Sequence, residues 1–499
     1  MRTSPIISHK SMTAEEAASL IRNGETVGTS GFTPAGYPKA IPIALAARAR
    51  EIHAAGEEFR IQLWTGASAG DELDGELVRA HALSKRIPYQ SNKDLRNAIN
   101  SGEVEFVDLH LSHVAQFIRY GFIDQCTTAI VEAIDVTTDG KIYLSMAGGM
   151  SATYIKQADR VLIELNEHFL EEMKGLHDVY LPAPPPHRAA IPIYHPSDRI
   201  GVPYVQVDPK KIVGIVKTNL PDSNAEFRAP DAESDAIAGH IIDFLKHEER
   251  MGRLPKNLPF QSGVGNVANA VLCRLASTPG IDPIMMYTEV VQDSIFQLID
   301  ADRLDCASTC ALTLSPKAQE RFQREINLHK DRFVLRQQEM SNHPEVIRRV
   351  GIISMNTAVE IDLFGNVNST HVLGSKMLNG IGGSGDFCRN AYISIFMTPS
   401  TAKNGNISAV VPMVTHVDQN EHSVQVVVTE QGLADLRGLS PVKKARLIIE
   451  KCAHPDYRGL LREYLDYGLE NAPSKHTPHV LERAFEFHNR LAKNGSMRA

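Results

Sequence analysis

The sequence predicts an α/β fold with mainly parallel sheets, and two recurring patterns support that prediction. Short apolar runs rich in β-branched residues recur along the chain, and amphipathic segments with helical periodicity lie between them. Strands that alternate with helices in this way form parallel sheets covered on both faces. We expect strands at residues 127–131, 161–163, 212–216 and 424–428, and helices at 41–52, 234–250 and 441–451.

The chain is long enough for two domains. Its 499 residues exceed what one hydrophobic core usually supports. A strand, a Ser-Gly turn and an alanine-rich helix occur at 25–50 and again at 259–275, which indicates two related halves. The polar, proline-containing segment 219–235 lies between them. We therefore expect an N-terminal α/β domain over 1–227 and a C-terminal α/β domain over 228–499.

Composition and charge exclude several classes of protein. The chain is 43% hydrophobic and 22% charged, a balance typical of globular proteins. Its formal net charge of −7 argues against a nucleic-acid-binding protein, which would normally present a basic face. No apolar run reaches the roughly 18 residues of a membrane span. The N-terminus lacks the apolar core and cleavage site of a signal peptide, so we expect a cytoplasmic protein.

The cysteines do not form a recognisable metal motif. Only Cys306 and Cys310 lie close together in the sequence, and no second Cys/His pair of zinc-site spacing accompanies them. We expect reduced thiols and no metal.

Glycine-rich segments are the first candidates for binding. Gly263-Val264-Gly265 opens a helix, where exposed backbone N–H groups suit a phosphate or a developing oxyanion. The segment 379–387 is richer in glycine than a structural loop requires, so we favour close approach of its backbone to a ligand. The segment 65–70 follows a predicted strand. Each segment can also be a plain strand-to-helix turn.

Two carboxylates at the ends of apolar strands are the second class of candidates. Glu289 follows Met285–Thr288, and Glu430 ends the run Val424–Thr429. In α/β proteins, ligands bind at the carboxyl ends of the strands. Burial there raises the pKa of a carboxyl group and makes its ionised form a stronger nucleophile. From spacing alone, either carboxylate can equally be a salt-bridge partner.

These segments together resemble the acetyl-CoA hydrolase/transferase family of class I CoA-transferases. The resemblance extends in order over essentially the whole chain. The matching motifs of the second half are QSGVGNVANAV, YTEVVQDS, RQQEMSN, NSTHVLGSKMLNGIGGSGDF, VTEQGLADLRGLSP and KCAHPDYR. Those of the first half are SGFTPAGYPKAIP, TGAS and FVDLHLS.

The resemblance implies two NagB/CoA-transferase-like α/β domains with the active site in the cleft between them. It implies that Glu289, on the C-terminal domain, is the covalent nucleophile, and that Val264 and Gly383 lend backbone N–H groups to an oxyanion hole. Asn342 and Glu430 correspond to positions that hold the acyl or carboxylate group. The implied coenzyme A contacts are Gly263, Val264, Gly265, Asn266, Val267, Val359, Asn379, Gly383 and Lys403.

The implied activity is transfer of CoA between a short-chain acyl-CoA (succinyl-, propionyl- or acetyl-CoA) and a carboxylic acid. The reaction is ping-pong through a glutamyl-CoA thioester, with CoA as substrate and no tightly bound cofactor or metal. Hydrolysis of acetyl-CoA is the alternative, and a non-catalytic CoA- or sugar-phosphate-binding protein is a third possibility. The stretch 217–223 lacks the arginine of some succinate/acetate-type members and looks like the propionyl-CoA:succinate subgroup. The family suggests a homodimer.

Overall fold

The structure is a computed structural model that describes residues 5–226, 228–280 and 283–498. The chain divides into two compact units. Unit 1 comprises Met1–Phe227, Met285–Asp293 and Asp305–Val350, and unit 2 comprises Arg228–Ile284, Ser294–Leu304 and Gly351–Ala499. One boundary of the units thus falls at 227/228, but two later stretches belong to unit 1. The division into sequence-continuous domains 1–227 and 228–499 stays a prediction.

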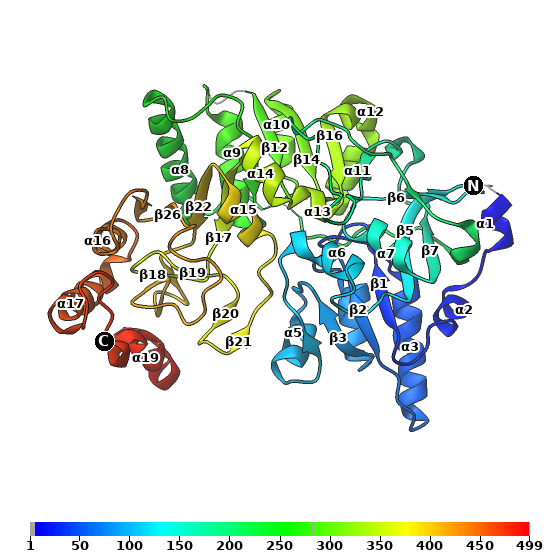
Figure 1. The fold of residues 1–499 in the computed structure, drawn as a ribbon, viewed down its shortest axis with the longest axis horizontal. Coiled ribbons are helices and arrows are strands. Elements are labelled where there is room, and N and C mark those ends of the chain that lie inside the picture. The colour runs from blue at the N-terminus through cyan, green and yellow to red at the C-terminus, as the bar shows by residue number, and fades with distance from the viewer. Residues whose placement is uncertain (1–4, 227, 281–282, 499) are drawn as a thin grey trace. The chain divides into compact units, whose positions relative to one another are not determined.

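The first sheet of unit 1 has the strand order β10-β7-β5-β1-β2-β3-β4, and neighbouring strands along this path are parallel (Figure 1). Strands β6 and β9 extend it in antiparallel pairing from β5. The strands are β1 Thr26–Thr29, β2 Ile61–Trp64, β3 Leu83–Ile87, β4 Glu105–Phe106, β5 Thr128–Val136, β6 Lys141–Leu144, β7 Arg160–Asn166, β9 Val205–Gln206 and β10 Ile212–Thr218. The predicted α/β fold with mainly parallel sheets is confirmed.

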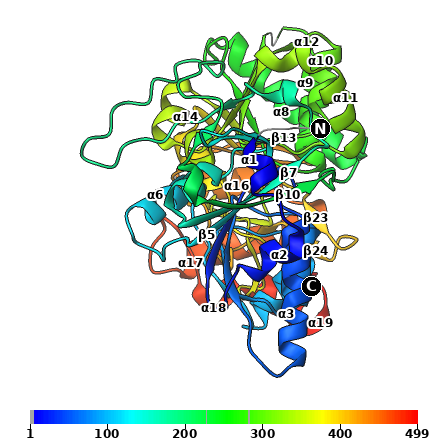
Figure 2. The same ribbon diagram turned by 90° about the vertical axis from the view of Figure 1, so that its right-hand side faces the viewer.

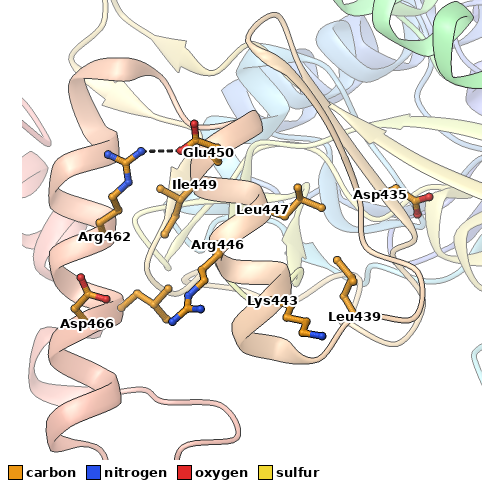
Figure 3. Close-up of a pocket in the computed structure, with 10 residues that line it drawn as sticks. Asp435, Leu439, Lys443, Arg446, Leu447, Ile449, Glu450, Arg462 and Asp466 are labelled. Atoms are coloured by element: carbon orange, nitrogen blue, oxygen red, sulfur yellow. Dashed lines mark hydrogen bonds and ion pairs between the residues drawn. The ribbon is translucent and has the colours of Figure 1, made fainter.

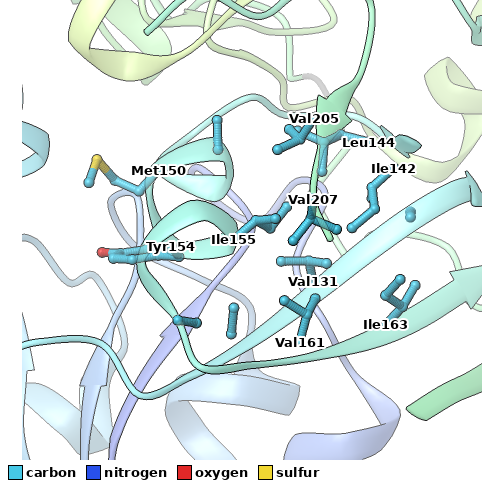
Figure 4. Close-up of a cluster of buried hydrophobic side chains, with 14 of the residues drawn as sticks. Val131, Ile142, Leu144, Met150, Tyr154, Ile155, Val161, Ile163, Val205 and Val207 are labelled. Atoms are coloured by element: carbon cyan, nitrogen blue, oxygen red, sulfur yellow. The ribbon is translucent and has the colours of Figure 1, made fainter. Parts of the chain in front are cut away.

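Helices cover this sheet, and one of its cores lies under α7. Helices α2 and α3 pack side by side (Figure 2). Ile155 of α7 faces Val131 and Val161 of the sheet (Figure 4), and the hydroxyl of the buried Tyr154 of the same helix donates to the carbonyl of Thr65 at 2.9 Å. Each fully buried valine contributes about 1.5–3 kcal/mol. The helices are α2 Ala14–Ser19, α3 Ala40–Ala54, α5 Lys93–Asn100, α6 Leu111–Arg119 and α7 Ser151–Gln157.

Unit 1 also contains most of a second set of strands in the order β12-β14-β16-β8. Strands β14, β16 and β8 are parallel to one another, and the N–H of Thr288, just after β12, donates to the carbonyl of Ser308 in β14 at 2.9 Å. The strands are β8 His177–Asp178, β12 Ile284–Tyr287, β14 Leu304–Thr309 and β16 Phe333–Arg336.

Unit 2 contains strands in the order β27-β26-β22-β17-β11. Strands β11, β17, β22 and β26 are parallel, and β27 closes the edge in antiparallel pairing with β26. The strands are β11 Phe260–Ser262, β17 Ile353–Thr357, β22 Ile393–Met397, β26 Val426–Thr429 and β27 Gly432–Asp435, and the main helices are α8 Ala232–Arg250, α9 Asn266–Ser277, α15 Ser384–Asn390, α16 Pro441–Lys451, α17 Pro455–Asn471 and α19 Glu486–Asn494.

Most helices and strands begin close to where we expected them, but β5 continues to Val136, beyond the predicted residue 131. Helix α16 spans the predicted residues 441–451, whereas α8 begins two residues before the predicted Ser234. The reason is its N-cap: the carboxylate of Asp231 accepts from the N–H of Ser234 at 2.8 Å. Strand β26 begins at Val426 instead of Val424, which is buried in the core outside the strand. Among the described residues, no helix combines the length and apolarity needed to cross a membrane.

A buried charge cluster fixes the loop after β1 in unit 1. The ammonium of Lys39 lies 2.7 Å from Glu132 and 2.8 Å from Asp222, and all three side chains are at most 1% exposed. Burial alone lowers the pKa of Lys39, but the two carboxylates outweigh burial and raise this pKa, so the lysine stays charged. The carboxylate of Glu164 accepts from the N–H of Lys39 at 2.8 Å and of Ile41 at 2.6 Å, at the start of α3.

Replacing Lys39 should destabilise the protein strongly. Among the ion pairs of the described residues, Lys39 is the only cation that contacts Glu132 and Asp222. Lys39→Met removes this cation and leaves two carboxylates buried together. We expect a loss of about 3–5 kcal/mol, because a buried charge without its partner keeps its desolvation cost. Thermal and urea unfolding measure the loss.

Arg50→Met is the matched control. Arg50 and Glu76 form an exposed ion pair at 2.8 Å. Exposed ion pairs contribute less than about 1 kcal/mol to stability, so the midpoint of thermal unfolding should hardly change. Equal losses in the two variants would contradict the importance of the buried cluster.

Candidate active site

Four parallel strands of unit 2 bring most of the predicted site residues to one edge. Strands β11, β17, β22 and β26 are neighbours in this order, and their carboxyl ends lie side by side, with Ser262 opposite Met355 and Met397 opposite Val428. The segment 263–267 follows β11, Val359 lies two residues after β17, and Glu430 follows β26. This is the edge at which α/β proteins bind ligands.

The loop after β11 presents backbone N–H groups at the start of α9. The N–H of Gly263 donates to the carbonyl of Met355 at 3.0 Å, which fixes the exit from the strand. Gly265 has φ +109°, a conformation that favours glycine, and α9 begins at Asn266 without a side-chain cap. Val264 is 47% exposed. The exposed amino end of this twelve-residue helix suits a phosphate or an oxyanion.

The second glycine-rich loop leads into α15. Gly382 has φ +59°, and the buried Gly383 is the N-cap residue of this helix. Helix α15 packs against β17 and β22 and continues into β22. We therefore expect its amino end to point toward the carboxyl edge of these strands. The side-chain oxygen of Asn379, at the start of the loop, is buried without a hydrogen-bond partner.

Glu430 is held as an ionised carboxylate. One carboxylate oxygen accepts from the N–H of Ser400 at 2.7 Å, and the other accepts from the Ser400 hydroxyl and from the amide of Gln431 at 3.0 Å. Burial alone raises the pKa of Glu430, but these hydrogen bonds outweigh burial and lower this pKa. Ser400 is a contact that sequence analysis missed, because it lies 30 residues from Glu430 in the chain.

The remaining predicted contacts of unit 2 differ in exposure. Val359 is half-buried, and its N–H donates to the carbonyl of Asn368 at 2.8 Å. Lys403 is exposed at the turn between β23, Thr401–Ala402, and β24, Ile407–Ser408, with φ +48°. Its exposed ammonium can reach an anion.

Glu289 lies in unit 1, at a bend between β12 and β13, Val290–Val291. Its side chain is half-buried, whereas its backbone is firmly held. The carbonyl oxygen of Glu289 accepts from the hydroxyl of Thr309 and from the N–H groups of Cys310 and Ala311, each at 3.0 Å. The end of β14 therefore fixes the position from which this carboxylate projects.

Glycines pack against the segment that holds Glu289. The N–H of Gly149 donates to the sulfur of Cys310 at 3.3 Å, and the N–H of Gly148 donates to the carbonyl of the same cysteine at 2.9 Å. A Cβ atom on Gly66 would lie 2.3 Å from the carbonyl oxygen of Gly31. Backbone packs on backbone here, which explains the glycine at position 66. Sequence analysis noted that segment but assigned it no role.

Asn342 is buried in unit 1 with an unsatisfied oxygen. Its side-chain amide donates to the carbonyl of Gln338 at 3.0 Å, while its side-chain oxygen has no hydrogen-bond partner. The side-chain oxygen of Gln338, in α13 Gln338–Ser341, is also buried without a partner. The N–H of Gln338 donates to the carbonyl of Gly149 at 3.0 Å, which ties α13 to the glycine packing near Glu289. Buried acceptors without donors indicate a ligand or an ordered water.

A hollow of about 750 Å³ lies between α16 and α17 in unit 2, away from the predicted residues (Figure 3). Its apolar lining includes Leu439, Leu447 and Leu465. Glu450 and Arg462 form an ion pair at 2.7 Å at its margin. None of the predicted site residues lines this hollow, so we do not assign it to the active site.

Comparison with known proteins identifies the family. The model of the acetyl-CoA hydrolase/transferase N-terminal domain matches residues 7–217, and that of the C-terminal domain matches residues 319–465. The chain belongs to the acetyl-CoA hydrolase/transferase family. The resemblance found in its sequence is thereby confirmed, and so is the expectation of an enzyme of this family.

Members of this family that resemble the chain carry two kinds of name. The succinyl-CoA:acetate CoA-transferase of Clostridium kluyveri is 48% identical and covers 99% of this chain and 91% of its own. The propanoyl-CoA:succinate CoA transferase of Escherichia coli is 48% identical, and the match covers 97% of this chain and 98% of its own. The acetyl-CoA hydrolase of Schizosaccharomyces pombe is 45% identical, and the match covers 96% of this chain and 94% of its own.

A solved structure shares the fold. RipA from Yersinia pestis superimposes with a TM-score of 0.71 at 22% identity, covering 92% of this chain and 97% of its own. This likeness supports the α/β architecture with mainly parallel sheets.

Replacing Gly66 should test the backbone packing near Glu289. In Gly66→Ala the new methyl group meets the Gly31 carbonyl at 2.3 Å, and neither backbone segment can move without disturbing the strand ends. We expect a loss of about 1–3 kcal/mol, as for other overpacked cores. Thermal unfolding measures it.

The control is Gly239→Ala at a half-buried position of α8. The nearest atom to a Cβ there lies 3.7 Å away, and alanine forms helices better than glycine. Its unfolding midpoint should stay the same or rise. A similar midpoint for both variants would contradict the packing argument.

Proposed function

We propose that the protein transfers CoA from a short-chain acyl-CoA to a carboxylic acid, with Glu289 as the covalent nucleophile. The observation that carries the proposal is the Glu289 carboxylate itself. It is half-buried at the end of β12, and three hydrogen bonds fix its backbone. Two relatives that are 48% identical over nearly the whole chain are named CoA-transferases, which supports the same chemistry here.

The reaction proceeds by covalent catalysis. A carboxylate oxygen of Glu289 attacks the thioester carbonyl of the acyl-CoA. The C–S bond breaks, leaving an acyl-glutamyl anhydride and CoA thiolate. The thiolate then attacks the glutamyl carbonyl and releases the first carboxylic acid as its carboxylate. The product is a glutamyl-CoA thioester, and an incoming carboxylate reverses these steps to leave with CoA.

Each tetrahedral intermediate carries a negative oxygen that needs hydrogen-bond donors. We assign this role to the backbone N–H groups of Val264 and Gly383, which belong to loops at helix starts in unit 2. Loss of one such donor costs about 3 kcal/mol of barrier.

The other predicted residues bind CoA and the acids. The exposed Lys403 offers its ammonium to a phosphate of CoA, and the side-chain oxygen of Asn379 can accept from an amide N–H of pantetheine. Asn342 positions the acyl or carboxylate group. Glu430 is the exception among them. It is ionised, and a carboxylate repels a carboxylate substrate, so we propose that it holds Ser400 and the loop after β22 next to the substrate instead of binding the acid directly. The segment 263–267 and Val359 complete the CoA contacts.

Hydrolysis is the second candidate function, since a relative 45% identical is named acetyl-CoA hydrolase. Water attacks the glutamyl-CoA thioester of any such enzyme, so the two activities share the first half of the reaction. The chain lacks an arginine in residues 217–223, and we propose that short monocarboxylic acids or succinate bind without that contact. The cytoplasmic location, the homodimer and the absence of a tightly bound cofactor stay predictions.

Glu289→Gln should abolish transfer. The amide cannot attack a thioester, and loss of a nucleophile can cost as much as about 10⁶-fold in kcat. Incubation of the native protein with acyl-CoA, followed by borohydride, should reduce the glutamyl thioester, and mass spectrometry of the peptide should locate the change at position 289.

Glu320→Gln is the matched control, because this glutamate is exposed in the same unit. It should keep both the activity and the borohydride-dependent mass change. Full activity of Glu289→Gln, or a mass change at another residue, would remove the mechanism.

The balance of transfer and hydrolysis can be measured directly. With acetyl-CoA and excess succinate or propionate, we expect new acyl-CoA to form much faster than free CoA is released, because a bound carboxylate competes with water for the thioester. Free CoA that is released at the same rate with and without the acid would identify the protein as a hydrolase.

Lys403→Ala should raise the KM for acyl-CoA by about 10- to 100-fold, since a charge-assisted hydrogen bond contributes about 1.5–3 kcal/mol. The kcat should change little, because the contact is equal in the ground and transition states. The exposed Lys475→Ala is the control and should leave both constants unchanged. Unchanged KM in Lys403→Ala would remove the phosphate contact.

A further inference from the structure

The segment between β8 and β9 in unit 1 is long and irregular. Residues 179–204 carry no helix or strand, and only an isolated bridge between Val179 and Val202 closes the segment at its ends. Loops of this length without secondary structure are uncommon in compact domains unless they are functional or specifically anchored. We call this segment the 179–204 loop.

One anchor of the 179–204 loop is Arg349. Its guanidinium donates to the carbonyl of Ile193 at 2.6 Å and to the carbonyl of Ile191. The same guanidinium lies 4.7 Å from the ring centre of Tyr194, although that side chain is 70% exposed. The backbone before residue 195 is therefore fixed.

The second anchor is the buried ion pair between Arg336 and Asp178. The guanidinium of Arg336 also donates to the carbonyl of Pro196 at 3.0 Å. The carboxylate of Asp178 accepts from the N–H of Ile200 at 3.0 Å and of Gly201 at 2.7 Å. The backbone after residue 195 is therefore fixed as well.

His195 is held between these anchors. The backbone N–H of His195 donates to the carboxylate of Asp198 at 2.8 Å. Its Nδ1 lies 2.7 Å from the Ser197 hydroxyl oxygen and 3.3 Å from the backbone nitrogen of Ser197. In the tautomer in which Nδ1–H donates to the Ser197 hydroxyl, Nε2 keeps its lone pair and points in a defined direction, as in metal-binding histidines.

Opposite the loop, β14 supplies a carboxylate and a thiol. One ligand atom each of His195, Asp305 and Cys306 lies within 4.8 Å of the other two. Cys306 is 3% exposed, Asp305 is exposed and His195 is half-buried. The backbone N–H of Ser197, which contacts the histidine, also contacts the thiol of Cys306. One imidazole, one thiol and one carboxylate form a donor set that suits zinc.

We propose that His195, Asp305 and Cys306 bind a zinc ion that clamps the 179–204 loop to β14, with water in the fourth position. This goes beyond the proposed transferase chemistry, in which Glu289 needs no metal. Binding takes the proton from the Cys306 thiol to solvent and forms bonds from zinc to sulfur, nitrogen and oxygen. The anchors from Arg349 and Arg336 position His195 before the metal arrives, which lowers the ordering cost of binding.

Zinc titration of the metal-free, full-length protein tests the proposal. We expect one zinc ion per chain by calorimetry and by metal analysis after dialysis. Cobalt in place of zinc should give a thiolate-to-cobalt charge-transfer absorption. Zinc should also slow tryptic cleavage after the half-buried Arg188 of the loop.

Cys306→Ser and His195→Ala should each weaken zinc binding by more than about 100-fold, because even second-shell partners contribute 10- to 100-fold. The controls are Cys273→Ser, a thiol outside the cluster, and His187→Ala, an exposed histidine of the same loop. Both controls should bind zinc as the native protein does, and CoA transfer should be unchanged in all four variants.

No zinc binding to the native protein, or unchanged binding in Cys306→Ser and His195→Ala, would overturn the proposal. Equal losses in the control variants would overturn it too. If Cys306→Ser does not fold, Asp305→Asn decides, because Asp305 is exposed and its substitution leaves the core intact. Weakened binding in Asp305→Asn supports the site, and native affinity excludes it.

Discussion

The ammonium of Lys39 organises the first sheet of unit 1. It neutralises two carboxylates that come from distant parts of the chain, Glu132 in β5 and Asp222 after β10. A buried charge without a partner is costly, so the three segments can be buried together only when all three groups meet. The loop after β1 and the segment after β10 are thereby fixed at the same edge of the sheet, since Asp222 also accepts from the N–H of Gly36 at 3.0 Å.

The ends of parallel strands also position the candidate active-site residues. Parallel strands place their carboxyl ends at one edge, and backbone groups there have no further strand partner. In unit 2 that edge gathers glycine turns and Glu430. In unit 1 the end of β14 holds the carbonyl of Glu289, and the glycine packing around Gly66 and Gly149 holds the end of β14 in turn. Rigid backbone under a half-buried carboxylate is what a nucleophile of defined direction requires.

The fold and the site were predictable to different degrees. The periodicity of the sequence located helices such as α16 and strands such as β10, because local propensity and tertiary burial agree there. The motif around Asn342 pointed to that residue but not to Gln338, whose buried unsatisfied oxygen is visible only in three dimensions. Ser400 escaped sequence analysis because its contact with Glu430 spans 30 residues and leaves no local pattern.

The sequence by itself determined the family and the α/β architecture, because periodicity and ordered motifs are local properties of the chain. The family resemblance also predicts Glu289 as the nucleophile. Only the tertiary structure decided that residues 285–293 and 305–350 join the N-terminal part in one compact unit. It alone showed that Glu430 is fixed by Ser400 and that His195 lies against Cys306. These outcomes depend on side chains and backbone groups far apart in sequence, whose pairing is set by burial and hydrogen bonding in the folded chain.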